Sequence, residues 1–244
     1  MLSYRHAFHA GNHADILKHI VLTLIIKSLN NKDKPYTLID SHAGAGRYAL
    51  DDPRLLKTGE AQAGIEKLLQ EEKEGKIPED IASIIEPYLN LVKSYAQQGM
   101  YPGSPEIESS LMRAQDNLIL MELHNTEIEV LKQNMNDDFE QKTRLRPHIH
   151  HRNGFEGIKA MVPPTPRRGL VFTDPSYETD EDYLLVSQTF SSAIKKWPRG
   201  IFVLWYPLLH HRVQDIASMK QSILSAAQIF AENAEIADFE LSLS

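Results

Sequence analysis

Short apolar segments alternate with longer amphipathic stretches along this chain. Residues 16–29 are almost continuously apolar and end at the polar residues 30–35, which predicts a helix covered by the rest of the protein. Helical stretches separate most of the predicted strands, and this order is typical of a parallel sheet covered on both faces. We therefore expect an α/β fold. The strands are predicted from short segments rich in apolar and β-branched residues, at 36–40, 118–123, 169–173 and 200–206, and residues 147–151 are a further candidate strand with fewer apolar residues.

One interval between strands is much longer than the others. About 70 residues separate the first strand from the second, far more than one crossover helix requires. Residues 61–98 predict helices broken near 75–78 and at Pro87, and residues 101–105 predict a turn. We expect residues 51–102 to form an inserted helical subdomain of a main domain made of residues 1–50 and 103–244. The alternating residues 236–244 predict one more strand.

The composition is that of an ordinary globular protein. The 244 residues are 42% hydrophobic and 24% charged, which excludes disordered and coiled-coil chains. The absence of cysteine excludes a disulfide framework, a cysteine nucleophile and a thiolate metal site. The histidine pairs at 9/13 and 148/150 lack a third ligand at zinc-site spacing, so we expect no metal. No apolar run is long enough to cross a bilayer, and we expect a cytoplasmic protein with no membrane partner.

The net charge of −7 argues against a nucleic-acid partner, because contacts to phosphate need lysine and arginine. Residues 142–152, however, contain basic residues and no acid. The charge pattern therefore leaves open both a nucleic-acid partner and an ordinary solvated surface.

A glycine turn follows the first predicted strand. The sequence Gly44-Ala45-Gly46 begins a match to the dinucleotide-binding pattern, but the acid at the usual distance lies in a helical stretch. Glu122 instead ends the second strand, where a carboxylate can hold two ribose hydroxyls. Asp40 ends the first strand, and a carboxylate there favours S-adenosylmethionine, whose sulfonium is a cation, over a pyrophosphate. A tight turn with no ligand remains an alternative.

The fourth predicted strand ends in Asp174-Pro175-Ser176-Tyr177, at the edge where open α/β sheets place their chemistry. The amino group of adenine is a poor nucleophile because its lone pair is delocalised into the ring. The Asp174 carboxylate and the Pro175 carbonyl can accept its two hydrogens and direct the lone pair at a methyl group, while Tyr177 stacks on the base. Such an adenine must be single-stranded or flipped out of its stack. In isolation the motif is also compatible with a plain β-turn.

Several segments together resemble one family. The Asp-Pro-Ser-Tyr turn is similar to the Asp/Asn-Pro-Pro-Tyr motif of amino-group methyltransferases, and residues 2–19, 40–48, 101–105 and 122–124 resemble the RlmJ family of bacterial 23S ribosomal RNA adenine-N6 methyltransferases. The match covers nearly the whole chain. It implies a Rossmann-like class I fold dependent on S-adenosyl-L-methionine, with an inserted helical subdomain. It also implies 23S rRNA as the partner and adenine 2030 of that RNA as the target.

The resemblance implies a role for individual residues. It places the methionine part of the cofactor near Lys18, His19, His42 and Ser104, with Gly44 in the cofactor turn. It also implies that Glu122 binds the ribose of the cofactor and that Asn153 and Gly154 lie beside its adenine. The catalytic position is Asp174, and the RNA is expected to meet Tyr4 and Arg5.

Two departures from the family accompany the match. Ser176 replaces the second proline, which loosens the turn and adds a hydroxyl. Family members usually continue for a few dozen residues beyond this length, so we expect the chain to be truncated at its C-terminus. We expect a monomer. The alternatives that remain are a DNA adenine-N6 methyltransferase, a protein glutamine-N5 methyltransferase, and a module that binds a nucleotide-like ligand without catalysis.

Overall fold

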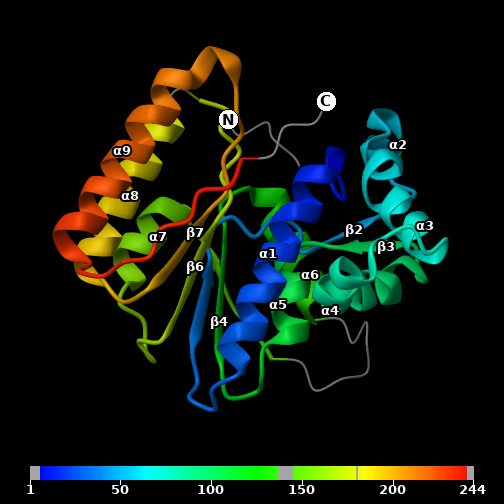
Figure 1. Cartoon of the computed structure of the whole chain (residues 1–244), viewed down its shortest axis with the longest axis horizontal. Helices are drawn as coiled ribbons and strands as arrows, with labels where there is room; N and C mark the ends of the chain where they lie inside the picture. Colours follow the sequence, from blue (N-terminus) through cyan, green and yellow to red (C-terminus); the bar gives the residue numbers. More distant parts are fainter. Residues whose placement is uncertain (1–5, 137–144, 180, 241–244) are drawn as a thin grey trace.

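A five-stranded parallel sheet forms the centre of the molecule (Figure 1). The computed structural model describes residues 6–136, 145–179 and 181–240. The strand order is β5-β4-β1-β6-β7, with β1 and β6 buried at every position. The α/β prediction is confirmed, and each of the five predicted strands is present. They are β1 (Thr37–Asp40), β4 (Asn117–Glu122), β5 (His148–His151), β6 (Gly169–Thr173) and β7 (Ile201–Leu204).

Helices cover both faces of this sheet (Figure 1). One face carries α1 (His13–Asn30), α5 (Ser104–Leu111) and α6 (Asn125–Asn136), whose apolar residues share a core with β1 and β4. The other face carries α7 (Gly154–Met161), α8 (Glu181–Lys196) and α9 (Val213–Phe230). Because β1 and β6 are covered on both faces, each has consecutive apolar residues without alternation, Leu38 and Ile39 in β1 and residues 170–172 in β6. Among the described residues, no helix combines the length and apolarity that a membrane span needs.

The long interval after β1 is helical, as predicted, and lies to one side of the sheet (Figure 1). It contains α2 (Pro53–Thr58), the π-helical turn η2 (Gln62–Glu66), α3 (Lys67–Lys73) and α4 (Glu79–Ala96). At its two ends, β2 (Arg47–Ala49) pairs antiparallel with β3 (Met100–Pro102). The division into a main domain and a subdomain at residues 51–102 remains a prediction.

Two expectations for this interval were wrong. The helix does not break at Pro87, because α4 continues through it and buries one face, which includes Tyr88 and Val92. Burial of that face offsets the hydrogen bond that proline cannot donate. Residues 101–105 are not only a turn, since β3 and the start of α5 divide them. A three-residue strand whose partner lies about fifty residues away leaves no local periodicity to detect.

The predicted strand at 236–244 is not formed over residues 236–240, and 241–244 lie outside the described residues. Ile236 and Phe239 are exposed, so the alternating pattern does not bury an apolar face. Polar contacts hold the segment instead: the Asp238 carboxylate accepts a hydrogen bond from the Tyr206 hydroxyl at 2.7 Å and pairs with Lys220.

Candidate active site

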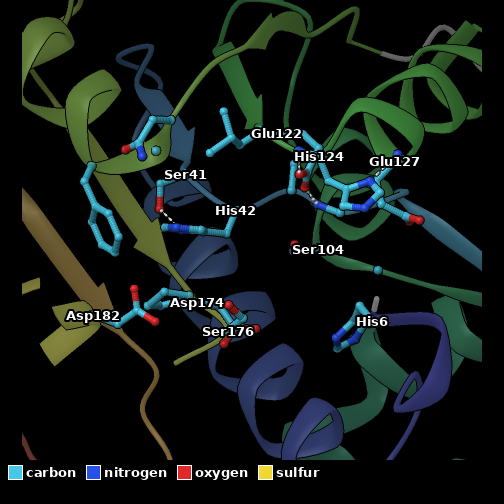
Figure 2. A pocket seen from close by; sticks show the side chains of 18 of the residues that line it. His6, Ser41, His42, Ser104, Glu122, His124, Glu127, Asp174, Ser176 and Asp182 are labelled. Atoms are coloured by element: carbon cyan, nitrogen blue, oxygen red, sulfur yellow. Dashed lines mark hydrogen bonds between the residues drawn. The ribbon is translucent and has the colours of Figure 1, made fainter. Parts of the chain in front are cut away.

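A cavity lies at the carboxyl ends of β1, β4 and β6. From β1 the chain adds β4 and β5 on one side and then β6 and β7 on the other, so this is the topological switch point of the sheet. Open α/β sheets bind ligands at this point. Figure 2 shows Asp174, Ser176 and Asp182 on one side and Glu122, His124 and Glu127 on the other. Most of the residues expected to form the site line this cavity: Lys18, His19, His42, Gly44, Ser104, Glu122, Asn153, Gly154, Asp174 and Pro175.

The glycine turn and Glu122 form one unit of the cavity wall. Gly44 has φ +59, and a Cβ on it would lie 2.5 Å from the Tyr48 hydroxyl, so the turn requires glycine. The Glu122 carboxylate accepts hydrogen bonds from the backbone N–H of Gly44 at 2.8 Å and of His124 at 2.6 Å. Burial raises the pKa of Glu122, although these two hydrogen bonds lower it. Each carboxylate oxygen keeps a further lone pair with which to accept from a ligand hydroxyl.

Asp40 lies behind the cavity wall rather than in it. It is fully buried and accepts hydrogen bonds from the Ser104 hydroxyl at 2.7 Å and the His42 backbone N–H at 3.0 Å. Burial raises the pKa of Asp40 to about 7, although both hydrogen bonds favour its charged form. Because Ser104 donates its proton to Asp40, the lone pairs of its hydroxyl are available to a donor such as an ammonium group in the cavity.

A buried charge cluster joins α1 to the Asp-Pro-Ser-Tyr turn. The ammonium group of Lys18 lies 2.8 Å from Asp15 and also contacts the Asp174 carboxylate. Asp15 in turn accepts from His6 at 2.8 Å. Burial disfavours the charges on Asp15 and Lys18, but the opposite charges outweigh it, so the pKa of Asp15 falls well below its usual value and that of Lys18 rises. Asp174 is therefore held by a cation rather than left free in the cavity.

Two histidines in the cavity wall are neutral near pH 7. Burial lowers the pKa of His19 to about 3 and that of His42 to about 4. His19 hydrogen-bonds with the Tyr101 hydroxyl at 2.9 Å, and His42 with the Ser41 hydroxyl at 2.8 Å. Neutral imidazoles here add no positive charge next to a cationic ligand.

Asn153 caps α7 at the far end of the cavity. Its side-chain oxygen accepts a hydrogen bond from the Glu156 backbone N–H at 3.2 Å. The predicted contact of Asn153 with the adenine of a cofactor would have to share that oxygen.

The remaining site predictions fall outside the cavity or outside the described residues. The ring of Tyr177 packs on Tyr183 with centroids 4.7 Å apart, and its hydroxyl donates to the Trp205 carbonyl. Tyr177 does not line the cavity, and its stacking on a base stays a prediction. Tyr4 and Arg5 lie outside the described residues.

Sequence reasoning assigned no role to Asp15, and for His6 the resemblance implied only an N-terminal segment beside the cofactor and the RNA, although both residues belong to the charge cluster. Asp15, Lys18 and His19 interrupt the apolar start of α1, and charged residues within a buried helix are a usable signal. His6 had no comparable signal, because its partner lies nine residues away across a turn. Within the described residues, no group of three or more histidine, aspartate or glutamate side chains is arranged to hold a metal ion.

Comparison with known proteins identifies the family. The family model described as "Ribosomal RNA large subunit methyltransferase D, RlmJ" matches residues 33–236. This chain belongs to the RlmJ family. The site just described lies within or beside the matched residues, apart from its contributions from η1 (His6–Phe8) and α1.

Individual RlmJ relatives agree over most of their length. The chain is 43% identical over 212 residues to ribosomal RNA large subunit methyltransferase J of Escherichia coli K12, covering 86% of this chain and 71% of the relative. It is 41% identical over 209 residues to the Haemophilus influenzae Rd protein of the same name, with the same shares. A crystal structure of a Legionella pneumophila protein superposes with a TM-score of 0.75 at 31% identity, covering 91% of this chain and 76% of the other.

Proposed function

We propose that this chain transfers a methyl group from S-adenosyl-L-methionine to the N6 amino group of an adenine in 23S rRNA. Membership of the RlmJ family supports large-subunit ribosomal RNA as the substrate. The observation that carries the chemistry is that Asp174 and Pro175 line the same cavity as Glu122 and Ser104. The first pair supplies acceptors for an amino group, and the second pair supplies acceptors for a nucleoside with an ammonium-bearing chain. A monomeric, cytoplasmic enzyme remains our expectation.

The donor set of the cavity fits the cofactor. Glu122 offers acceptors to two ribose hydroxyls, and Ser104, oriented by Asp40, offers one to the amino group of the methionine part. The acids lining the cavity include Glu122, Glu127, Asp174 and Asp182, which suits a ligand that carries two cationic groups. When bound, S-adenosylmethionine supplies an electrophilic methyl group on its sulfonium.

The residues around Asp174 provide for the adenine. Pro175 fixes the backbone after β6, so that its carbonyl and the Asp174 carboxylate are held as two acceptors for one amino group. Lys18 holds the carboxylate in place from α1. When the N6 nitrogen of the adenine gains a methyl group, that nitrogen must release a proton. Under this proposal, Asp174 is the carboxylate in contact with the N6 nitrogen.

Substitution of Asp174 tests the assignment. We expect Asp174→Ala and Asp174→Asn to lower the methyl-transfer rate by about a thousandfold, since a positioned acceptor is lost. The affinity for S-adenosylhomocysteine, measured by calorimetry, should change less than about threefold, because Glu122 and Ser104 remain. Asp215→Asn, on α9 outside the cavity, is the control and should act like the wild type. Methylation at the wild-type rate by Asp174→Ala would refute the catalytic role.

A further inference from the structure

The N-terminal segment lies between the cavity and the helical insertion. Its η1 turn carries His6, which lines the cavity (Figure 2), and residues 9–12 lead from there into α1. On the cavity side, the Asp15 carboxylate accepts from His6 at 2.8 Å and from the Gly11 backbone N–H at 2.9 Å. These contacts tie the segment to the first turn of α1.

The insertion holds the same segment from the opposite side. The Thr58 hydroxyl donates to the Phe8 carbonyl, and the Ile65 backbone N–H donates to the Gly11 carbonyl, both at 2.9 Å. Gly64 approaches so closely that a Cβ on it would lie 2.2 Å from the Gly11 carbonyl oxygen. The insertion therefore contacts the N-terminal segment through backbone as well as side-chain atoms.

The Glu60 side chain contacts two side chains of the N-terminal segment. It follows Gly59, the residue that caps α2. Its carboxylate lies 2.9 and 3.0 Å from His9 Nδ1 and accepts from the Asn12 side-chain amide at 2.9 Å. The Asn12 side-chain oxygen at the same time caps α1, where it accepts from the Asp15 backbone N–H at 2.9 Å. Glu60 thus contacts the turn on both sides of its bend, before and after Gly11.

We propose that Glu60 is a positioning residue for methyl transfer, an inference that rests on the proposed function. Through Asn12 it fixes the first turn of α1, where Asp15 holds Lys18 against Asp174. Through His9 it fixes η1 and with it His6 on the cavity wall. The Glu60 side chain does not line the cavity, so it acts only through these residues. The insertion consequently supports one wall of the active site.

The exposure of His9 and Glu60 distinguishes a positioning role of Glu60 from a role in folding. The side chains of His9 and Glu60 are 40% and 33% exposed. Ion pairs at such sites contribute little to stability because solvent screens them and ordering costs side-chain entropy. Removing Glu60 should therefore leave the fold intact while loosening the segment that carries His6. Activity then becomes the sensitive measurement.

Kinetics on three variants test this proposal. Glu60→Ala should lower kcat for 23S rRNA methylation by about tenfold, since small misplacements of catalytic groups are costly. The KM for RNA and the affinity for S-adenosylhomocysteine should change less than about threefold. Glu60→Gln should keep at least about half of kcat, because its amide oxygen still accepts from Asn12 and His9. Glu66→Ala, an exposed acid on η2, is the matched control and should equal the wild type.

Hydrogen exchange gives a measurement that needs no RNA. The backbone N–H groups of His9 and Asn12 donate within the segment, to His6 and His9 carbonyls. In Glu60→Ala they should exchange about tenfold faster than in the wild type, while exchange in β1 and β6 stays the same. Unchanged exchange, an unchanged kcat, or equal losses in Glu60→Ala and Glu60→Gln would overturn the inference. A wild-type protein that fails to methylate RNA would instead refute the proposed function.

Discussion

The chemistry of Asp40 depends strongly on its surroundings. It is fully buried, yet its only described hydrogen-bond donors are a hydroxyl and a backbone N–H, neither of which carries a charge. Burial therefore dominates and raises its pKa to about 7. Asp40 is ionised above that pH and neutral below it. The neutral form no longer favours a cationic ligand beside Ser104.

This titration predicts a pH dependence of cofactor binding. We expect the affinity for sinefungin, which carries cationic amino groups, to rise by at most about tenfold per pH unit as the pH passes from 6 to 8. His19 and His42, with pKa values near 3 and 4, stay neutral over this range and do not contribute. Calorimetry across the pH series measures the effect. Asp40→Asn should bind more weakly and lose the dependence, and an equal pH slope in that variant would contradict the role of Asp40.

At the residue scale, the sequence predicted the acceptor side chains of the cavity better than the residues that hold those side chains in place. Glu122 was predicted because it ends an apolar strand and Asp174 because it directly follows one, and strand ends meet at one edge of a parallel sheet. The contact between Lys18 and Asp174 joins residues 156 positions apart. No local pattern encodes such a distance, and only the resemblance to a family brought Lys18 to the cavity.

At the scale of elements, the contact between the insertion and the N-terminal segment is unusually close. Gly64 lies in the π-helical turn η2 and has no positive φ, so glycine is required there by space rather than by backbone conformation. A side chain there would meet the Gly11 carbonyl, which already accepts from Ile65. The two backbones would then have to move apart.

We therefore expect Gly64→Ala to destabilise the protein by about 1–3 kcal/mol, the usual range for overpacking a tight contact. Urea unfolding followed by circular dichroism measures the change. Gln62→Ala, an exposed neighbour on the same π-helical turn, is the control and should stay within about 0.5 kcal/mol of the wild type. A Gly64→Ala variant as stable as the wild type would show that the contact is looser than described.

Elements with a strong apolar pattern were predicted from sequence, and elements that depend on distant partners were not. The strands β1, β4, β6 and β7 and the helix α1 follow from apolar runs, whereas β5, with the sequence His-Ile-His-His, has no such run. The β2–β3 pair, the passage of α4 through Pro87 and the missing strand at 236–240 all depend on packing with residues far along the chain. Tertiary contacts decide such cases against local preference.

At the scale of the molecule, the distribution of charge indicates that the cofactor and the RNA phosphates bind to different parts of the protein. The chain carries a net charge of −7, and the cavity contains several acids beside Lys18. This suits a cationic cofactor more than an RNA phosphate. We infer that the cavity admits the adenine base, and that the phosphates of the RNA meet other parts of the surface.

Methyl transfer to competing acceptors tests the central claim most directly. Labelled S-adenosylmethionine would be offered to unmodified 23S rRNA, intact large ribosomal subunits and unmethylated DNA, with Asp174→Ala as the control, and the products digested to nucleosides. We predict label as N6-methyladenine in RNA, none in DNA or protein, and none with the variant. Label in DNA or protein, or none in any acceptor from a wild-type protein that binds the cofactor, would contradict the proposed function.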